Sequence, residues 1–368
     1  MNWGELITLE YGKPVKDKEA TDGKVPVYGT NGQIGTSHLP AQCKHPSFIL
    51  GRKGAYRGVH YSDCPFSVID TAFYAEPLTD RIDLKWAYYK FLTYDINGMD
   101  SGSAIPSTDR YQIYSIEVEV PPLEKQRKIV AVLDCIDRKI NINQKVNDNL
   151  EQQAQAIYHE RFETVSPNDL PSDWRIVTLG EVATISNKSF NPLKEPEILL
   201  EHYSIPAFDE VRFPVFELST SIKSNKFIID ASCFMISKLN PTTKRVWKPY
   251  CLTGNAVCST EFIVYKAKDK TITDFLYSVI DSNSFSDFMC SHVTGSTGSR
   301  QRTTPSDTLS YELILPSEDE QAEFQSLVSP MYAQIRINAI ENDRLKRLRD
   351  SLLPKLMSGE IDVSAVQL

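Results

Sequence analysis

Hydrophobic residues recur at alternating steps of four and three along two long stretches of the chain. The first stretch has this pattern at Ile129, Leu133, Ile136, Ile140, Asn143, Asn147, Leu150, Ala154 and Ile157. An offset of 195 residues gives the second stretch: Phe324, Val328, Met331, Ile335, Asn338, Asn342, Leu345, Arg349 and Leu352. The spacing is the heptad pattern of a coiled coil, so it predicts two long helices that are copies of each other.

The polar interruption of the heptads falls at the same place in both copies, because Asn143 and Asn147 correspond to Asn338 and Asn342. A buried asparagine costs stability but penalises slipped registers, since a shifted helix would leave its amide against apolar groups. We therefore expect these four residues to set the register of an antiparallel helix pair, with Asn143 and Asn338 facing each other close to the two-fold axis. A single heptad stretch is equally typical of an amphipathic helix packed on its own domain, and it is the in-register repeat that favours the coiled coil.

A shorter repeat precedes each globular segment, because residues 4–9 (GELITL) resemble residues 180–185 (GEVATI). The chain thus consists of globule, helix, globule and helix, and a duplicated chain of this kind is expected to have internal pseudo-two-fold symmetry. The predicted boundaries are 1–120 for the first globule, 121–165 for the first helix, 166–315 for the second globule and 316–368 for the second helix with a C-terminal tail.

Short apolar runs bounded by turn residues predict strands, and longer runs with helical spacing predict helices. The expected strands are Pro26–Gly29, Ser47–Leu50, Ser67–Tyr74, Lys226–Ile229, Cys233–Ile236 and Glu261–Tyr265, and the expected short helices are Leu84–Tyr94 and Ile272–Ser282. The fold class is accordingly α/β (α+β), with two globular domains joined by two long antiparallel helices.

Positive charge is concentrated in three stretches although the net charge is −8. Residues 23–62, 231–260 and 288–306 contain no Asp or Glu, while each contains Lys or Arg. Binding to DNA requires cations that neutralise phosphates, so the acid-free stretches are candidate contact surfaces. A basic run is also typical of an ordinary solvated face.

The candidate DNA contacts lie where these stretches combine cations with amides, aromatics and glycines, because these residue types contact phosphates and base edges. In the first globule they are Asn31, Gln33, Arg52, Lys53, Tyr56 and Arg57. In the second they are Lys238, Asn240, Thr243, Lys244, Arg245, Arg300, Gln301 and Arg302. For each of these residues, a purely structural role remains the alternative.

Catalytic and cofactor-binding signatures are not found in the sequence. The glycines of residues 29–35 are spaced like a phosphate-binding loop, but no P-loop Lys-Ser or Lys-Thr follows them. The chain also lacks an amino-methyltransferase Asp/Asn-Pro-Pro-Tyr/Phe motif, a His-Glu-x-x-His motif and a Gly-x-Ser-x-Gly elbow. The seven cysteines form no Cys-x-x-Cys pair, so no metal site is expected, and no segment is apolar enough for a membrane span. These features predict a cytoplasmic protein that recognises a ligand without catalysis.

Short segments in both halves of the chain carry a resemblance to a known family: Gly102–Pro106, Pro121–Gln126, Thr294–Arg302 and Leu352–Ile361, together with Val27–Gly35, Gly51–Gly54 and Ile69–Tyr74. Through them, and over essentially its whole length, the chain resembles the specificity (S) subunits of type I restriction-modification systems. The resemblance implies two target-recognition domains that each read one half of a split site in double-stranded DNA, with the helices fixing the spacing between them. Forty helical residues span roughly 60 Å, enough to place two readers about one duplex turn, roughly 34 Å, apart.

The same resemblance implies the partners of the chain. They are two methylation (M) subunits, which bind S-adenosylmethionine and modify adenine, and two ATP-dependent restriction (R) subunits. Neither cofactor is expected to bind this chain. A scaffold or interaction protein of a related defence system is an alternative, and a DNA-modifying enzyme with an unrecognised site is another.

Overall fold

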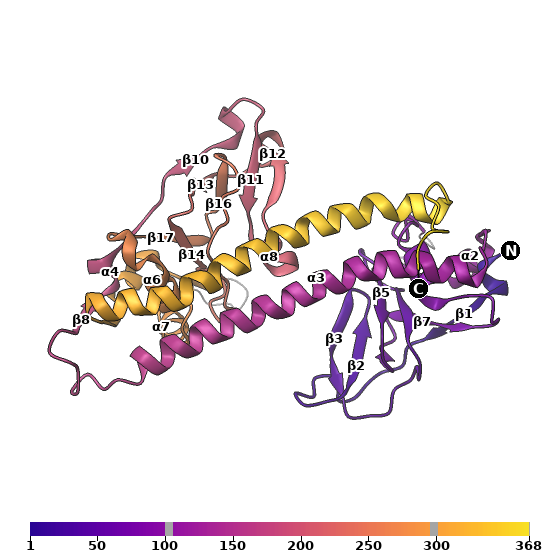
Figure 1. Ribbon diagram of the computed structural model, residues 1–368, viewed down its shortest axis with the longest axis horizontal. Coiled ribbons are helices and arrows are strands. Elements are labelled where there is room, and N and C mark those ends of the chain that lie inside the picture. The colour runs from indigo at the N-terminus through magenta and orange to yellow at the C-terminus, as the bar shows by residue number, and fades with distance from the viewer. Residues whose placement is uncertain (100–105, 295–300, 368) are drawn as a thin grey trace. The chain divides into compact units, whose positions relative to one another are not determined.

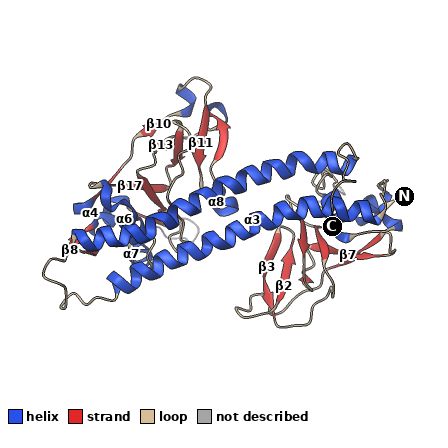
Figure 2. Cartoon of the chain, viewed as in Figure 1, coloured by secondary structure: helices blue, strands red, loops and turns tan. Residues whose placement is uncertain are grey.

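The computed structural model describes residues 1–99, 106–294 and 301–367. The chain divides into two compact units, one made of Met1–Lys139 with Leu345–Leu368 and the other of Ile140–Arg344. Both units contain strands and part of each of the two longest helices, α3 (Leu123–Tyr158) and α8 (Glu318–Ser358) (Figures 1 and 2). Among the described residues, no helix combines the length and apolar character that crossing a membrane requires.

The first unit contains two small sheets and two short helices. Its elements are β1 (Ile7–Tyr11), β2 (Val25–Gly29), β3 (Gly32–Ser37), β4 (Ser47–Gly51), β5 (Val59–Ser62), β6 (Ser67–Val68), β7 (Ala72–Pro77), α1 (Leu84–Phe91) and α2 (Arg110–Ser115). One sheet has the antiparallel order β1-β7-β4-β5, and the other has the order β3-β2-β6 with β2 parallel to β6. The single strand expected at Ser67–Tyr74 is wrong: the chain turns at Asp70, and its two parts belong to different sheets.

Aromatic side chains form the core of the first unit. Trp3, Trp86 and Phe91 are buried, and the ring of Trp3 lies 4.6 Å from that of Phe91. Helix α1 begins where the Asp83 carboxylate accepts hydrogen bonds from the first backbone N–H groups, an N-cap that fixes its start. The C-terminal tail joins the same core through Val363, after Gly359 ends α8 in the left-handed conformation that favours glycine.

The second unit has more strands than the first. Its strands are β8 (Arg175–Thr178), β9 (Ala183–Ile185), β10 (Ser189–Phe190), β11 (Leu199–Tyr203), β12 (Val215–Leu218), β13 (Lys226–Ile228), β14 (Cys233–Ser237), β15 (Val246–Trp247), β16 (Ala256–Ser259), β17 (Phe262–Ala267), β18 (Val293–Thr294), β19 (Arg302–Thr303) and β20 (Glu312–Leu315). Its short helices are α4 (Leu179–Val182), α5 (Ile205–Val211), α6 (Thr273–Ile280) and α7 (Asn283–Ser291). Additional helical turns in the two units are Trp3–Glu5, His159–Glu163, Pro192–Lys194, Ser219–Ser221, Lys270–Ile272 and Pro305–Ser310.

The two units repeat one strand order, which confirms the internal duplication. The second unit contains an antiparallel sheet β9-β17-β14-β15, whose order matches β1-β7-β4-β5 element by element. The pairing of Glu312 with Thr178 likewise corresponds to the bridge between Glu117 and Asn2. The larger five-stranded sheet, β10-β13-β16-β11-β12, contains the order β12-β11-β16 that corresponds to β3-β2-β6 and adds two strands, and β18 pairs separately with β19. The duplicated halves therefore share a framework and differ at the edge of one sheet.

The heptad positions are buried or half-buried in both long helices, as a coiled coil requires. In the first unit, Asp137 of α3 pairs with Arg349 of α8 at 3.0 Å. In the second unit, Arg161, which lies in the helical turn that directly follows α3, pairs with Glu323 of α8 at 2.7 Å. Residue numbers rise along one helix as they fall along the other, so the helices are antiparallel and the predicted fold class is confirmed.

Four asparagines of the second unit bond to one another across the helix pair. The Nδ2 of Asn143 donates to Oδ1 of Asn342 at 2.9 Å, and Nδ2 of Asn338 donates to Oδ1 of Asn147 at 2.8 Å. Asn147 and Asn342 also point their amides at the carbonyls of Ile335 and Ile140, each at 3.4 Å. Adding 195 to the residue numbers of α3 and subtracting 195 from those of α8 converts the Asn143–Asn342 bond into the Asn338–Asn147 bond, with the donors corresponding. The Asn147–Ile335 bond converts into the Asn342–Ile140 bond in the same way. The contacts therefore have local two-fold symmetry, but the expectation that Asn143 faces Asn338 is corrected: the hydrogen-bonded pairs are Asn143 with Asn342 and Asn147 with Asn338.

Replacing Asn143 by alanine is expected to lower the free energy of unfolding by about 1–3 kcal/mol, because Asn342 Oδ1 then loses its donor in a buried place. The exposed Asn141, on the same helix, is the matched control and should change the stability by less than about 0.5 kcal/mol. Urea unfolding of both variants, of Asn342→Ala and of the double variant gives the coupling between the two asparagines. Strictly additive effects would contradict the interaction.

Candidate nucleic-acid interface

The predicted contacts of the first unit gather at residues 52–58, which connect β4 to β5. This loop is fixed by hydrogen bonds from Gly58 N to Thr30 O (3.1 Å), from Thr30 Oγ1 to Lys53 O (2.9 Å) and from Gly54 N to Pro106 O (3.0 Å). The Asn31 amide, oriented by its hydrogen-bond partners, donates to the Tyr56 carbonyl at 2.8 Å. The β2–β3 turn and the 52–58 loop, which are separate in the sequence, thus form one surface feature.

Several of these side chains are accessible to a ligand. Tyr56 is 69% exposed at the tip of the loop, and Gln33 is exposed on β3 with its amide donating to Gly35 O at 3.2 Å. Lys53 lies 3.8 Å from the Asp70 carboxylate, a long and solvated ion pair. Arg52 donates to the Asp70 carbonyl at 2.9 Å, which uses one of the five N–H donors of its guanidinium.

Arg57 differs from its neighbours because it is buried. It is 2% exposed, and its Nη2 donates to the carbonyls of Ile96 and Asn97 at 3.2 and 2.8 Å. A side chain with so little exposed surface can offer almost nothing to a duplex. The structural role that the sequence left open is therefore favoured for Arg57.

Arg110 and Tyr111, which were not among the predicted contacts, extend the first surface. The guanidinium carbons of Arg52 and Arg110 each lie 4.8 Å from the centre of the Tyr11 ring, and Tyr111 is 65% exposed. Such cation–π packing holds the planes of two arginines at the surface. Arg110 lies outside the acid-free stretches because Asp109 precedes it. The Asp109 carboxylate, however, caps α2 by accepting a hydrogen bond from Tyr111 N.

In the second unit, two predicted segments meet. Asn240 N donates to Gln301 O at 2.9 Å, and Thr303 N donates to Lys238 O at 3.1 Å. Asn240 has a left-handed backbone, with φ of 48°, that lets the chain reverse within this loop. The exposed Thr243 lies in the same loop. Arg300, with the rest of 295–300, lies outside the described residues, as does the 100–105 segment of the first unit.

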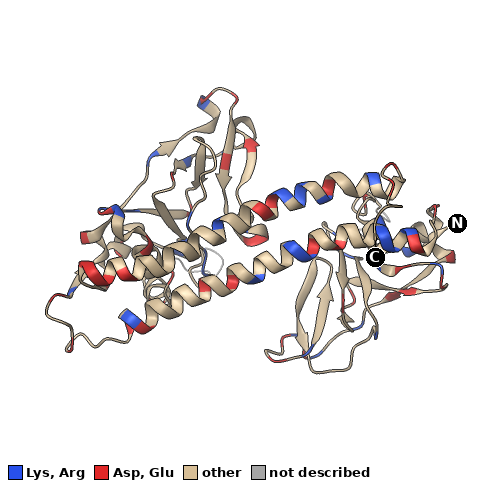
Figure 3. Cartoon of the chain, viewed as in Figure 1, with Lys and Arg blue, Asp and Glu red and all other residues tan. Residues whose placement is uncertain are grey.

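Acidic partners hold the remaining predicted cations of the second unit. Arg245 forms a bidentate pair with Asp209 at 2.6 and 2.9 Å, and Arg302 pairs with Glu261 through two contacts of 3.0 Å. Lys244 pairs with Asp281 at 2.8 Å. The acid-free stretches contain no Asp or Glu in the sequence, but acidic residues from other parts of the chain pack against their cations in the fold. Figure 3 shows acidic and basic positions interspersed along the ribbon. These cations are thus partly neutralised within the protein.

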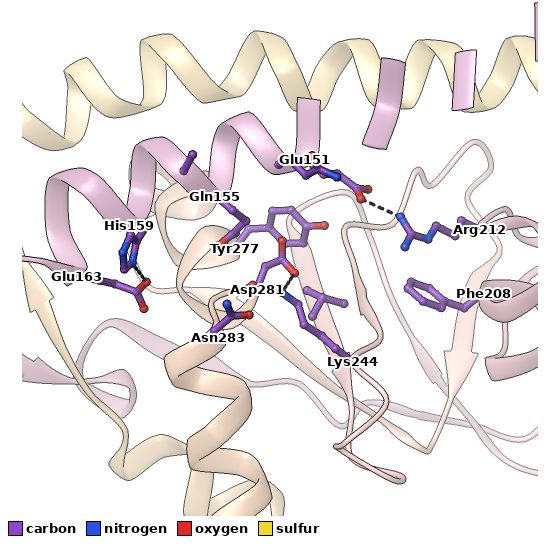
Figure 4. A pocket seen from close by; sticks show the side chains of 13 residues that line it. Glu151, Gln155, His159, Glu163, Phe208, Arg212, Lys244, Tyr277, Asp281 and Asn283 are labelled. Carbon is purple, nitrogen blue, oxygen red and sulfur yellow. Dashed lines mark hydrogen bonds and ion pairs between the residues drawn. The ribbon is translucent and has the colours of Figure 1, made fainter. Parts of the chain in front are cut away.

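Lys244 also lines a polar cavity of about 550 Å³ between α3 and the short helices of the second unit (Figure 4). Its other cation, Arg212, pairs with Glu151 at 2.8 Å, and Nδ1 of His159 lies 2.9 Å from the Glu163 carboxylate. Burial raises the pKa of Glu151 and of Asp281, while Arg212 and Lys244 oppose the increase. Because the charges compensate one another in pairs, the cavity presents no net attraction for an anion such as DNA.

The fold and its surfaces define a class: a duplicated α+β protein with an aromatic–cationic surface and an antiparallel coiled coil. The chain belongs to the family of the type I restriction modification DNA specificity domain, whose model matches residues 2–152 and again residues 171–347. The two matches fall on the two halves of the duplication, and each match covers a globule together with much of the long helix that follows it.

Relatives with curated descriptions are similar over most of their length. The chain is 24% identical to the type I restriction enzyme MjaIX specificity subunit of Methanocaldococcus jannaschii, covering 77% of this chain and 70% of the relative. It is 21% identical to the type I restriction enzyme HindI specificity subunit of Haemophilus influenzae, with 74% of each covered. These names describe specificity rather than catalysis.

The fold also matches a solved structure, that of a type I restriction-modification system S subunit from M. genitalium. The alignment has a TM-score of 0.56 at 17% identity and covers 97% of this chain and 95% of the other. At this level of identity, the match supports the fold.

Proposed function

We propose that the chain is the non-catalytic DNA-sequence specificity subunit of a type I restriction-modification complex. The observation that carries the proposal is that one DNA specificity domain is matched twice, on two halves with the same strand order. Two readers in one chain suit a bipartite site, each domain reading one half, with the helices setting the distance between the halves. The complex would act in the cytoplasm.

The site residues in this proposal are those that the sequence selected apart from the buried Arg57, with Arg110 and Tyr111 added to the first domain. Arginine can pair bidentately with guanine, and asparagine or glutamine with adenine, while lysine and threonine more often hold phosphates. In the second domain, the pairs of Lys244, Arg245 and Arg302 would have to open, or to hold the loops while other side chains read bases. Exposed Thr243 is a candidate for direct contact.

Catalysis in this proposal belongs to partner subunits: two M subunits that methylate adenine and two R subunits that use ATP. Support comes from the names of the relatives and from the missing catalytic motifs. The asparagine-bonded helix pair suits a rigid spacer, because slipping it by one turn would break four polar contacts at once.

The test is to co-express the chain with its M subunit and to map methylated adenines in the host genome by single-molecule sequencing, with the M subunit alone as the control. We expect two short specified blocks around a gap of fixed length. A continuous motif would contradict recognition by two domains. A methylation pattern that does not depend on the chain would favour the scaffold alternative.

A further inference from the structure

A thiol, an imidazole and a carboxylate converge on one side of the first unit. Cys43 and His45 precede β4, and Glu76 lies on β7. The Cys43 Sγ lies 3.9 Å from His45 Nε2, which lies 2.7 Å from Glu76 Oε2, and all three donor atoms fall within 4.8 Å of one another. None of these residues belongs to the candidate DNA contacts.

The backbone around the cluster is fixed before any ligand binds. Cys43 and Phe66 exchange two backbone hydrogen bonds of 3.0 Å, and Ser47 Oγ donates to Ala75 O at 2.6 Å, next to Glu76. These contacts tie the segment of Cys43 and His45 to its neighbours on both sides. Three donors held in this way lose little conformational freedom on binding an ion.

The orientation of His45 suits coordination through Nε2. Its Nδ1 lies 3.0 Å from the Pro46 carbonyl, which can only accept, so Nδ1 carries a proton. In the neutral ring the lone pair is then on Nε2, the atom that faces the carboxylate and the sulfur. A backbone carbonyl on the other ring nitrogen is the usual arrangement for a metal-ligating histidine.

We propose that Cys43, His45 and Glu76 bind a zinc ion, with water as the fourth ligand. Sulfur, imidazole nitrogen and carboxylate oxygen are the donor atoms that Zn²⁺ uses in proteins. At zinc–ligand distances of about 2.0–2.3 Å in a tetrahedron, sulfur and nitrogen lie roughly 3.6 Å apart and nitrogen and oxygen roughly 3.4 Å apart. The sulfur–nitrogen distance of 3.9 Å is already close to this value, and the nitrogen–oxygen distance of 2.7 Å has to increase by less than about 1 Å.

Access and charge are compatible with this site. Cys43 is fully buried, whereas the side chains of His45 and Glu76 are 38% and 33% exposed, so an ion and its water can enter from solvent. Burial raises the pKa of the Cys43 thiol to about 11, and zinc would displace the thiol proton to water on binding. The bound ion would pin the segment before β4 to the end of β7. This proposal departs from the expectation of no metal site, which rested on the absence of a Cys-x-x-Cys pair.

The competing explanation is an ion pair between protonated His45 and Glu76, with Cys43 a bystander. Cobalt(II) distinguishes the two, because a cysteine-bound Co²⁺ has a thiolate charge-transfer absorption that a histidine–carboxylate pair cannot produce. The full-length chain is stripped with a chelator and titrated with Co²⁺, then with Zn²⁺ as competitor. We expect one equivalent with the thiolate absorption, displaced by Zn²⁺, and a higher melting temperature with zinc.

The variants Cys43→Ser, His45→Gln and Glu76→Gln are expected to weaken zinc binding at least about tenfold, since loss even of outer partners typically costs that much. Cys64→Ser and His38→Gln, both at exposed positions, are the matched controls and should bind as the unmodified chain does. If Cys43→Ser fails to fold, the more exposed His45→Gln retains the test. Absence of the thiolate absorption in the unmodified chain, or its persistence in Cys43→Ser or His45→Gln, would overturn the proposal.

Discussion

Replacing Glu201 by glutamine is expected to lower the free energy of unfolding of the second unit by about 3–5 kcal/mol. Glu201 is fully buried on β11, and its carboxylate accepts from Leu252 N at 2.9 Å and Thr253 N at 2.7 Å. It also accepts from the hydroxyls of Thr253 and Tyr203, at 3.1 and 2.6 Å. Hydrogen bonds to a charged acceptor contribute about 1.5–3 kcal/mol each. Glutamine keeps the shape but turns an N–H toward Thr253 N–H, where two donors meet.

The Glu201 network also holds a strained loop in place. The Tyr203 hydroxyl accepts from the backbone N–H groups of Tyr250 and Cys251 at 2.8 and 2.9 Å while donating to Glu201. Cys251 has φ of 45°, a left-handed conformation that a cysteine rarely adopts and that costs of order 1 kcal/mol or more. Losing the carboxylate therefore weakens the contacts that offset this strain, and the Tyr203→Phe variant should weaken them too.

Urea unfolding followed by tryptophan fluorescence measures the effect, since Trp247 packs 4.7 Å from the Tyr203 ring. Glu210→Gln, at an exposed position of α5 in the same unit, is the matched control and should change stability by less than about 0.5 kcal/mol. Equal stability of Glu201→Gln and Glu210→Gln would show that the buried carboxylate contributes little.

The sequence predicted the long helices and the duplication well because both depend on patterns repeated many times. Each heptad position separately indicates which face of the helix is apolar. The corresponding residues Asn143 and Asn338 fix the offset between the two copies at 195 residues. Strands such as β4 and β14 were also found, since each is a continuous apolar run. Ser67–Tyr74 was misread as one strand because Asp70 and Thr71, which form the turn, are compatible with a strand in a local pattern.

The surfaces could be predicted only in part because charge compensation depends on contacts that are distant in sequence. Arg245 meets Asp209, and Arg302 meets Glu261, from outside the acid-free stretches that suggested them. The burial of Arg57 depends on carbonyls of residues 96 and 97, which no local pattern reveals. The roles of these residues toward DNA remain predictions that experiment has to decide.

Replacing Arg52 by alanine is expected to relax specificity at one position of the half-site read by the first domain and to leave the other half-site unchanged. Arg52 is half-buried, and its guanidinium is held by the Asp70 carbonyl and lies over the Tyr11 ring. A side chain held in this way can pair bidentately with a base at small entropic cost, and such a pair discriminates by about 1–3 kcal/mol, roughly 5- to 150-fold in affinity. Competition binding with duplexes that differ at single positions, at one fixed salt concentration, measures this ratio for the chain with its M subunit.

Arg52→Lys separates base reading from phosphate contact in the same position. Lysine keeps the positive charge but cannot reproduce the planar fork, so it should not restore discrimination if Arg52 reads a base. If Arg52 only neutralises a phosphate, lysine should restore binding, and alanine should weaken all duplexes equally while lowering the salt dependence by about one ion.

Arg245→Ala is the counterpart in the second domain. Because both carboxylate oxygens of Asp209 accept from one edge of the Arg245 guanidinium, this variant is expected to disturb only the second half-site, by loosening residues 238–245. A loss of specificity in both half-sites from either variant would contradict independent reading by the two domains.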